Sequence, residues 1–193
     1  MTDRVARLRL AAAAGNVRLA QAIGTALPAR ERIAERDFAR VDRDPLGALN
    51  KVEFVLKQTP GRELALYALE RAARSDAAQV RPAWEKQRGQ LPEAERRYGN
   101  ARIAYHAARQ LRPEAHAWYL EAGKEPLGEV ERAWQVRAAL RAGSWNGVLA
   151  ATDGMSASQA AETAWRYWRA RALAALGRGT EADVLYAALA AED

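Results

Sequence analysis

Apolar residues recur at helical spacing near the carboxyl end of the chain, between residues 164 and 190. One set stands at i, i+3, i+7 and i+11, and a second set, further along, stands at i, i+3 and i+7. They are Trp165, Trp168, Ala172 and Leu176, followed by Ala182, Leu185 and Leu189. Each set forms one stripe of a helix. Gly177 lies between them and favours the left-handed backbone that ends a helix, so the pattern predicts a helical hairpin.

The same pattern occurs 34 residues earlier in the chain. Aligning Gly143 with Gly177 also superposes a large aromatic residue, a basic residue and a small contact residue. The matched pairs are Trp134 with Trp168, Arg137 with Arg171, and Ala138 with Ala172. A repeat of this length is typical of a tetratricopeptide-type helix pair. Such hairpins stack on one another, so we expect a solenoid of helical hairpins.

Proline and glycine divide the amino-terminal part of the chain into shorter helical segments. Asp3 can cap a first helix, which the Gly15-Asn16 pair ends. The second helix is expected to bury one stripe of apolar residues. This stripe consists of Leu19, Ala22, Ile23 and Ala26. A third helix is expected from Ala29 to about Val41, because Pro28 suits the first turn of a helix.

A stronger apolar pattern follows. Asp44-Pro45 is a helix start signal, whereas Thr59-Pro60-Gly61 predicts a turn. The next helix has a wide apolar face, formed by Leu64, Ala65, Ala68, Leu69, Ala72 and Ala73. Ser75-Asp76 is expected to cap a further helix, and Pro82 is expected to kink or break it, because proline removes a helical hydrogen bond.

After a restart at Leu91-Pro92-Glu93, the chain contains another helix with a buried stripe. This stripe consists of Ile103, Ala104, Ala107, Ala108 and Leu111. Pro113 is expected to begin the next helix, and Gly123 to Gly128 form a looser connector before the closing hairpins. The whole pattern predicts about ten to twelve helices and no strand. We therefore expect an all-α superhelix, or solenoid, forming a single helical domain over residues 1–193.

Composition excludes several classes of site. Apolar residues make up 49% of the chain and charged residues 28%, as in a folded globular protein. The chain has no cysteine, which excludes disulfides and thiolate metal sites. His106 and His116 are ten residues apart, unlike a helical metal motif, so both are interpreted as surface or interhelical residues. No run of eighteen apolar residues occurs, so no membrane span is expected.

The sequence predicts no catalytic residue, no metal ligand and no cofactor site. Four carboxylates cluster beside Lys124 and Arg132, and we interpret them as a solvated helix start. They are Glu121, Glu125, Glu129 and Glu131. Neither histidine accompanies a nucleophile in a recognisable turn. Gly177-Arg178-Gly179 follows a helix rather than a strand, so it is interpreted as a turn and not as a phosphate-binding loop.

Arginines interleaved with aromatic residues form the candidate binding site. The formal net charge of +6 favours anionic partners such as nucleic acid, acidic lipid or an anionic cell-wall polymer. The candidate residues are Arg137, Arg141, Trp145, Arg166, Tyr167, Arg169 and Arg171. They are expected to point away from the tryptophan stripe, where they could stack on sugar rings or bases and pair with anionic groups. Alternatively, the aromatic residues belong to the core and the arginines are solvated or paired with nearby carboxylates.

The carboxyl-terminal part resembles the last repeats of the superhelical domain of soluble lytic murein transglycosylases. Three segments carry this resemblance, in order: Val136 to Trp145, Trp165 to Arg178, and Glu181 to Ala190. The similarity is good from about Glu131 to the end and looser from Arg62 to Tyr119.

The resemblance implies a periplasmic enzyme that cleaves the glycan strand of peptidoglycan and leaves a 1,6-anhydromuramyl end. In that family the catalytic glutamate lies in a separate lysozyme-like domain, within a Glu-Ser motif that does not occur here. We therefore expect a fragment that contains the non-catalytic helical domain. Its partners would be peptidoglycan glycan strands and its own downstream catalytic domain, not nucleic acid. The alternatives are a tetratricopeptide-like protein-interaction scaffold and an autonomous enzyme.

Overall fold

The computed structural model describes residues 3–192, and this part of the chain consists of helices and connecting turns, with no strand. The all-α prediction is confirmed. The helices are α1 (Asp3–Ala13), α2 (Val17–Thr25), α3 (Glu35–Arg43), α4 (Pro45–Asn50), α5 (Thr59–Arg88), α6 (Glu93–Arg109), α7 (Ala115–Ala122), α8 (Glu129–Arg141), α9 (Trp145–Asp153), α10 (Ala157–Ala160), α11 (Thr163–Ala175) and α12 (Gly179–Ala190). None of them is long and apolar enough to cross a bilayer.

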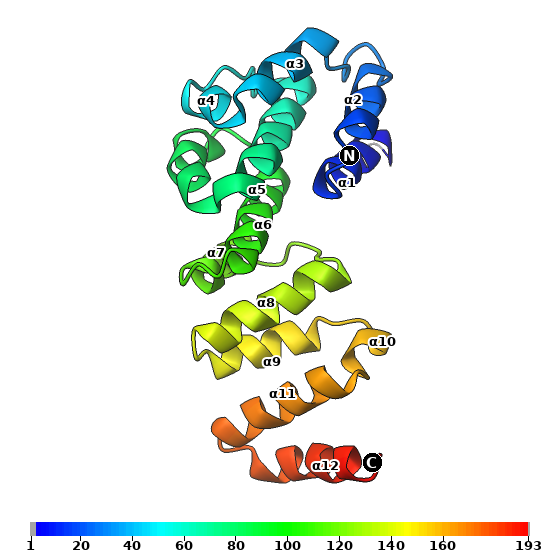
Figure 1. Ribbon diagram of the computed structural model, residues 1–193, viewed down its shortest axis with the longest axis vertical. Coiled ribbons are helices and arrows are strands. Elements are labelled where there is room, and N and C mark those ends of the chain that lie inside the picture. Colours follow the sequence, from blue (N-terminus) through cyan, green and yellow to red (C-terminus); the bar gives the residue numbers. More distant parts are fainter. Residues whose placement is uncertain (1–2, 193) are drawn as a thin grey trace.

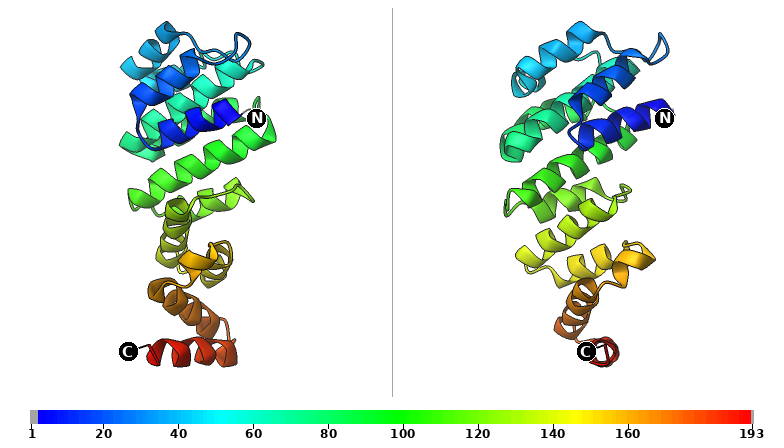
Figure 2. Two further views of the ribbon diagram at one scale, coloured as in Figure 1. Left: turned by 90° about the vertical axis from the view of Figure 1, so that its right-hand side faces the viewer. Right: turned by 45° about the vertical axis from the view of Figure 1, so that its right-hand side comes forward.

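The helices stack along one axis, as expected for a solenoid (Figures 1 and 2). Most contacts join helices that are close in sequence: α5 packs on α4 and α6, α6 on α7 and α8, and α8 on α9. The stack continues from α9 to α11 and from α11 to α12. One contact is longer in range, because α1 returns to pack against α5. This return places α1 beside the middle of the stack, where it lines a pocket together with α6.

Two hydrophobic cores hold the stack together. The first core extends from α1 to α7, with Ala138 of α8, and contains the largest fully buried side chains, among them Trp84, Tyr67 and Phe38. The second core lies within the two closing hairpins and includes Trp165, with Trp168 partly buried against it. Both indole positions therefore pack between helices, as the stripe in the sequence predicts.

The glycines of the two closing hairpins adopt the predicted left-handed backbone. The φ angles are +65° at Gly143 and +77° at Gly177. After Gly177 the chain reverses, and the N–H of Arg178 donates to the carbonyl of Leu173 at 2.9 Å. This bond satisfies one of the carbonyls left free at the end of α11.

We expect Gly177→Ala to reduce the free energy of unfolding by about 1 kcal/mol, because a Cβ is disfavoured at positive φ. No atom lies within 4 Å of the position that this Cβ would take, so the cost is confined to the backbone. Gly179→Ala is the matched control, since its surroundings are equally open and its φ lies outside the left-handed region. Urea unfolding followed by tryptophan fluorescence measures both. Equal effects of the two substitutions would contradict the prediction.

The stripe predicted for α2 is wrong except at Ile23, which is partly buried against the first core. The helix buries Ala20 and Gly24, whereas Leu19 is exposed. Ala22 and Ala26, of the same predicted stripe, are also exposed. The reason is a close approach of the ring of Phe38, whose Cζ lies 2.5 Å from the position that a Cβ on Gly24 would occupy. The face that permits close contact is buried in preference to the more hydrophobic face.

Helix boundaries near two prolines, Pro28 and Pro60, also differ from the prediction. Residues 28–34 are non-helical, so α3 begins at Glu35 instead of Ala29, although Ile33 and Phe38 are buried as expected. The segment Thr59-Pro60-Gly61 begins α5 instead of forming a turn, with proline in its first turn. A proline that fixes φ near −65° suits both structures, so tertiary packing selects between them.

The backbone of the long helix α5 leaves helical angles at Asp76, whereas Pro82 lies inside the helix. Asp76 has φ −154° and ψ 104°, and its carboxylate accepts the N–H of Ala78 at 2.9 Å, which confirms the predicted cap. Asp76 is where the backbone of α5 leaves helical angles, so the predicted break at Pro82 is wrong. The fully buried neighbours Val80 and Trp84 hold this turn in helical form.

Leu111 was expected in the buried stripe of α6, but the structure places it 56% exposed, beyond the end of the helix. Its φ is +58°, so it takes the left-handed position that ends a helix, and the N–H of Arg112 donates to the carbonyl of Ala107.

The next helix starts at Ala115 rather than at Pro113. Residues 123–128 are non-helical, as the connector prediction states.

Candidate functional site

The seven predicted binding residues do not form one face. Arg137 in α8 points toward the tryptophans and not away from them. Its guanidinium carbon lies 5.0 Å from the ring centroid of Trp134 and 5.1 Å from that of Trp165. Arg137 therefore joins α8 to α11 through cation–π contacts. The expectation that it projects freely from the tryptophan stripe is wrong.

On α11 the predicted residues divide between two sides of the helix. Arg166 pairs with Glu192, and Arg169 pairs with Asp153 at the end of α9. The ring of Tyr167 contacts those of Trp168 and Tyr186 edge-on, at centroid distances of 5.3 and 6.4 Å. Trp145, at the start of α9, packs against the second core. Arg141 and Arg171 are exposed and have no hydrogen bond or ion pair with any described residue. Glycan binding by these seven residues stays a prediction.

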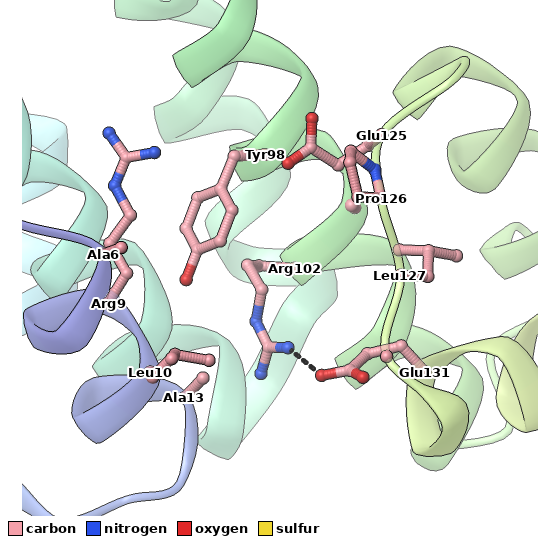
Figure 3. A pocket seen from close by; sticks show the side chains of 12 residues that line it. Ala6, Arg9, Leu10, Ala13, Tyr98, Arg102, Glu125, Pro126, Leu127 and Glu131 are labelled. Atoms are coloured by element: carbon pink, nitrogen blue, oxygen red, sulfur yellow. Dashed lines mark hydrogen bonds and ion pairs between the residues drawn. The ribbon is translucent and has the colours of Figure 1, made fainter. Parts of the chain in front are cut away.

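A pocket of about 360 Å³ lies elsewhere, between α1, α6 and the segment 125–131 (Figure 3). Its apolar walls are small or aliphatic, and they come from all three elements. They consist of Ala6, Leu10 and Ala13 of α1, Ala101 of α6, and Pro126 and Leu127. Its polar groups belong to Arg9, Tyr98, Arg102, Glu125 and Glu131. The pocket exists because α1 returns to the stack opposite the connector.

Arg102 anchors one side of the pocket through a buried ion pair with Glu70 of α5. Its Nε and Nη2 donate to the two carboxylate oxygens of Glu70 at 2.7 and 3.0 Å, and the two residues are 4% and 1% exposed. Nη1 donates to Glu131 at 2.8 Å. Nε2 of His106 also lies 2.8 Å from Glu70, which makes His106 an interhelical residue, as expected. All nitrogens of this guanidinium are therefore occupied.

Glu70 is ionised in this network. Burial by itself raises the pKa of a carboxyl group, but the hydrogen bonds with His106 and Arg102 outweigh burial and lower the pKa of Glu70 to about 2. A fixed anion at this position holds Arg102 in the orientation that Figure 3 shows, with its guanidinium turned toward Glu131.

Arg9 anchors the opposite side. It is 8% exposed, and its Nε and Nη2 donate to Glu63 of α5 at 2.8 and 2.6 Å. The guanidinium carbon of Arg9 lies 4.9 Å from the ring centroid of Tyr98, which stands between the two arginines. The two bidentate pairs thus fix α1 and α6 to α5 and frame the pocket.

Sequence reasoning missed these residues, although their spacing is regular. Tyr98, Arg102 and His106 stand at i, i+4 and i+8 of α6, and Glu63 and Glu70 stand two turns apart on α5. Charged residues that share one stripe of an otherwise apolar helix are the signal that could have found them. Their partners could not be read from the sequence, because they lie 32 to 54 residues away.

The connector carboxylates are not all solvated. Glu121 and Glu129 are exposed, but Glu125 and Glu131 line the pocket, with side chains 14% and 25% exposed. Burial raises the pKa of Glu125, and Arg97 and Arg9 lower it in part. The interpretation of all four carboxylates as a solvated helix start is therefore wrong for Glu125 and Glu131.

A second, larger hollow of about 700 Å³ adjoins the pocket. Both are lined by Arg9, Glu125 and Pro126, so the two hollows lie side by side. The second hollow is more strongly charged, because Arg62 and Arg97 of α5 and α6 line it together with carboxylates. Residues 3–192 contain no group of three or more His, Asp or Glu side chains that could hold a metal ion. The geometry is that of a binding groove with charges in fixed pairs.

No protein-family model and no curated protein sequence matches the chain. Among solved structures, the chain is similar to an inactive mutant of the lytic transglycosylase Slt from Pseudomonas aeruginosa. The TM-score is 0.67 and the sequence identity 25%, over 95% of this chain and 30% of that chain. The two share a fold. The chain spans less than a third of the length of that enzyme, so the similarity concerns one part of it.

Proposed function

We propose that this chain is the non-catalytic helical domain of a soluble lytic murein transglycosylase. In this proposal it shapes a groove that holds a peptidoglycan glycan strand while a separate catalytic domain cleaves it in the periplasm. The observation that carries the proposal is the similarity to Slt over 95% of this chain. The resemblance of the closing hairpins to the last repeats of that family supports it independently of the structure.

Charge supports a role in holding an anionic polymer. The formal net charge is +6, and exposed arginines with no partner among residues 3–192, such as Arg141 and Arg171, contribute to it. Long-range attraction of this kind concentrates an anionic strand near the surface and weakens as salt screens it. The paired charges in the groove can then provide hydrogen bonds of fixed geometry.

Co-sedimentation with purified murein sacculi over a salt series tests the proposal. We expect the chain to sediment with sacculi at low salt and to be released progressively as the ionic strength rises. The double variant Arg141→Glu with Arg171→Glu should weaken binding several-fold. Arg36→Glu with Arg43→Glu is the matched control, since it makes the same change in charge on α3, at the far end of the stack.

Failure of the wild-type chain to sediment at low salt would remove the binding role and favour the protein-interaction scaffold. Release of soluble muropeptides by this chain alone would contradict its non-catalytic character. A reading frame that joins the chain to a lysozyme-like domain with a Glu-Ser motif would support the proposed partnership.

A further inference from the structure

The pocket between α1, α6 and the segment 125–131 is poorly suited to an anion. Arg102 directs all its nitrogens to Glu70 and Glu131, and Arg9 directs two of its three to Glu63. Each of the two guanidinium charges is therefore neutralised by a buried carboxylate. Glu125 and Glu131 add negative charge on the connector side. An anionic ligand would meet no unpaired cation here.

The pocket nevertheless keeps open hydrogen-bonding groups of both kinds. Nη1 of Arg9 is a donor with no hydrogen-bond partner among residues 3–192. The carboxylate of Glu125 is an acceptor whose interaction with Arg97 spans 3.8 Å, too long for a hydrogen bond. Figure 3 shows the guanidinium of Arg9 and the carboxylate of Glu125 on either side of the Tyr98 ring, at one end of the pocket. A donor and an acceptor placed in this way match an uncharged amide, which needs one of each.

At the other end of the pocket, apolar side chains lie beside the Arg102–Glu131 ion pair (Figure 3). Leu10 and Ala13 of α1 face Leu127 of the connector, and the hydroxyl of Tyr98 points into the space between them and Arg102 (Figure 3). The apolar side chains can receive the C–H face of a sugar ring, while the tyrosine hydroxyl bonds a ring hydroxyl. The volume, about 360 Å³, lies at the lower end of the range for small-molecule sites, so it suits a single ring with its substituent.

We infer that this pocket is a subsite for one N-acetylated amino sugar of a glycan strand. The acetamido N–H would donate to Glu125, the acetamido carbonyl would accept from Nη1 of Arg9, and the methyl group would lie against Ala6 or Pro126 at the same end. The adjoining hollow leaves room for the strand to continue past Arg9 and Pro126. This inference rests on the proposed function, and it locates one sugar at a site distinct from the seven arginine and aromatic residues predicted from the sequence.

Isothermal titration of the whole chain with the tetramer of N-acetylglucosamine tests the subsite. The tetramer of glucose with the same β-1,4 linkage is the control ligand, because it differs only in having a hydroxyl group in place of each acetamido group. We expect the acetylated tetramer to bind about tenfold or more tightly than the glucose tetramer, since each buried amide hydrogen bond contributes to affinity. Equal binding of the two tetramers would overturn the inference.

Two variants locate the binding. Ala6→Leu extends a side chain from α1 into the pocket without lowering helix propensity, and it should weaken binding of the acetylated tetramer at least tenfold. Ala39→Leu on an exposed position of α3 is the matched control and should leave binding unchanged. Glu125→Ala, in the non-helical connector, should weaken binding about fivefold to tenfold. Circular dichroism confirms that each variant is folded.

The outcomes separate this inference from the proposed function. If sacculi bind the wild-type chain but Ala6→Leu and Glu125→Ala leave tetramer binding unchanged, the subsite is wrong and the proposed function stands. If the wild-type chain binds neither sacculi nor the tetramer, both fail. Loss of tetramer binding in both pocket variants, with the Ala39→Leu control unaffected, supports the subsite.

Discussion

Replacing Glu70 by alanine is expected to reduce the free energy of unfolding by about 3–5 kcal/mol. Glu70 is 1% exposed and accepts both hydrogen bonds of the Arg102 fork, and it also lies within hydrogen-bond distance of His106. Its loss leaves the buried guanidinium of Arg102 with Glu131 as its remaining ion-pair partner among the described residues. Leaving a buried charge without its counter-ion costs more free energy than the intact ion pair contributes to stability.

Urea unfolding at neutral pH measures this effect. Glu53→Ala is the matched control, because it removes a carboxylate whose pair with Arg40 is largely exposed, with side chains 35% and 43% exposed. The control should cost no more than about 1 kcal/mol. A loss for Glu70→Ala as small as that of the control would show that solvent reaches Arg102 and that the network is not buried.

The ion pair of Glu70 with Arg102 also predicts how the loss of stability in Glu70→Ala depends on pH. The pKa of Glu70 is lowered from 4.5 to about 2 in the folded chain. A carboxyl group whose pKa is lower in the folded chain than in the unfolded chain stabilises the fold fully at any pH above its unfolded pKa. This stabilisation is lost as the pH falls through its folded pKa. The difference in stability between wild type and Glu70→Ala should therefore be constant above about pH 5 and shrink between pH 4.5 and 2. A difference that grows on acidification would contradict the ionised state of Glu70.

Replacing Trp84 by alanine is expected to reduce the free energy of unfolding by about 3–5 kcal/mol. Trp84 is the largest fully buried side chain, and its Nε1 donates to Oδ1 of Asn100 at 2.7 Å. The substitution leaves a large cavity between α5 and α6 and removes the donor to Oδ1 of Asn100, whose Nδ2 still donates to the carbonyl of Glu121. Thermal or urea unfolding measures the loss, and a change below about 1 kcal/mol would mean that the core collapses onto the site.

A double-mutant cycle with Gly99 isolates the contact. A Cβ at Gly99 would lie 2.3 Å from Cζ2 of Trp84, so Gly99→Ala should destabilise the wild type by about 1–3 kcal/mol. In the Trp84→Ala background the same substitution should be neutral or stabilising, because the clash is removed and alanine favours a helix. Additive effects would contradict the contact between Gly99 and the indole.

Part of the fold followed from local signals. The stripes around Trp165 and Ala182 predicted the closing hairpin, and the positive φ angles at Gly143 and Gly177 match the turn positions taken from the repeat. These features depend on residues within about ten positions of one another, so the sequence contains the information needed. The cap at Asp76 is similarly local, since its carboxylate bonds the N–H two residues ahead.

Boundaries set by packing were harder to predict. Pro60 suits both a turn and a first helical turn, and Pro82 remains helical between buried neighbours. In α2 the buried face is selected by the ring of Phe38 against Gly24, and this contact outweighs the hydrophobicity of Leu19. In each case a contact from another helix overrides the local preference.

The candidate pocket was likewise predictable from the sequence only in part. The connector at residues 123–128 and the helical nature of α1 and α6 were predicted, but not that they face each other across a cavity. Arg137 was chosen from the sequence as a binding residue, whereas the structure places it over two indoles. In the sequence, an arginine beside aromatic residues is compatible both with ligand binding and with packing against the core. Only the position of the neighbouring hairpin distinguishes the two.

The sequence by itself determined that this protein is a stack of helical hairpins with glycine turns, because helical periodicity and the backbone freedom of glycine act over short distances. Only the tertiary structure decided that Arg9 meets Glu63, that Arg102 meets Glu70, and that a pocket opens between them. Paired charges of this kind are separated along the chain and become neighbours only when packing removes water from around them, so no local pattern specifies which carboxylate each arginine binds.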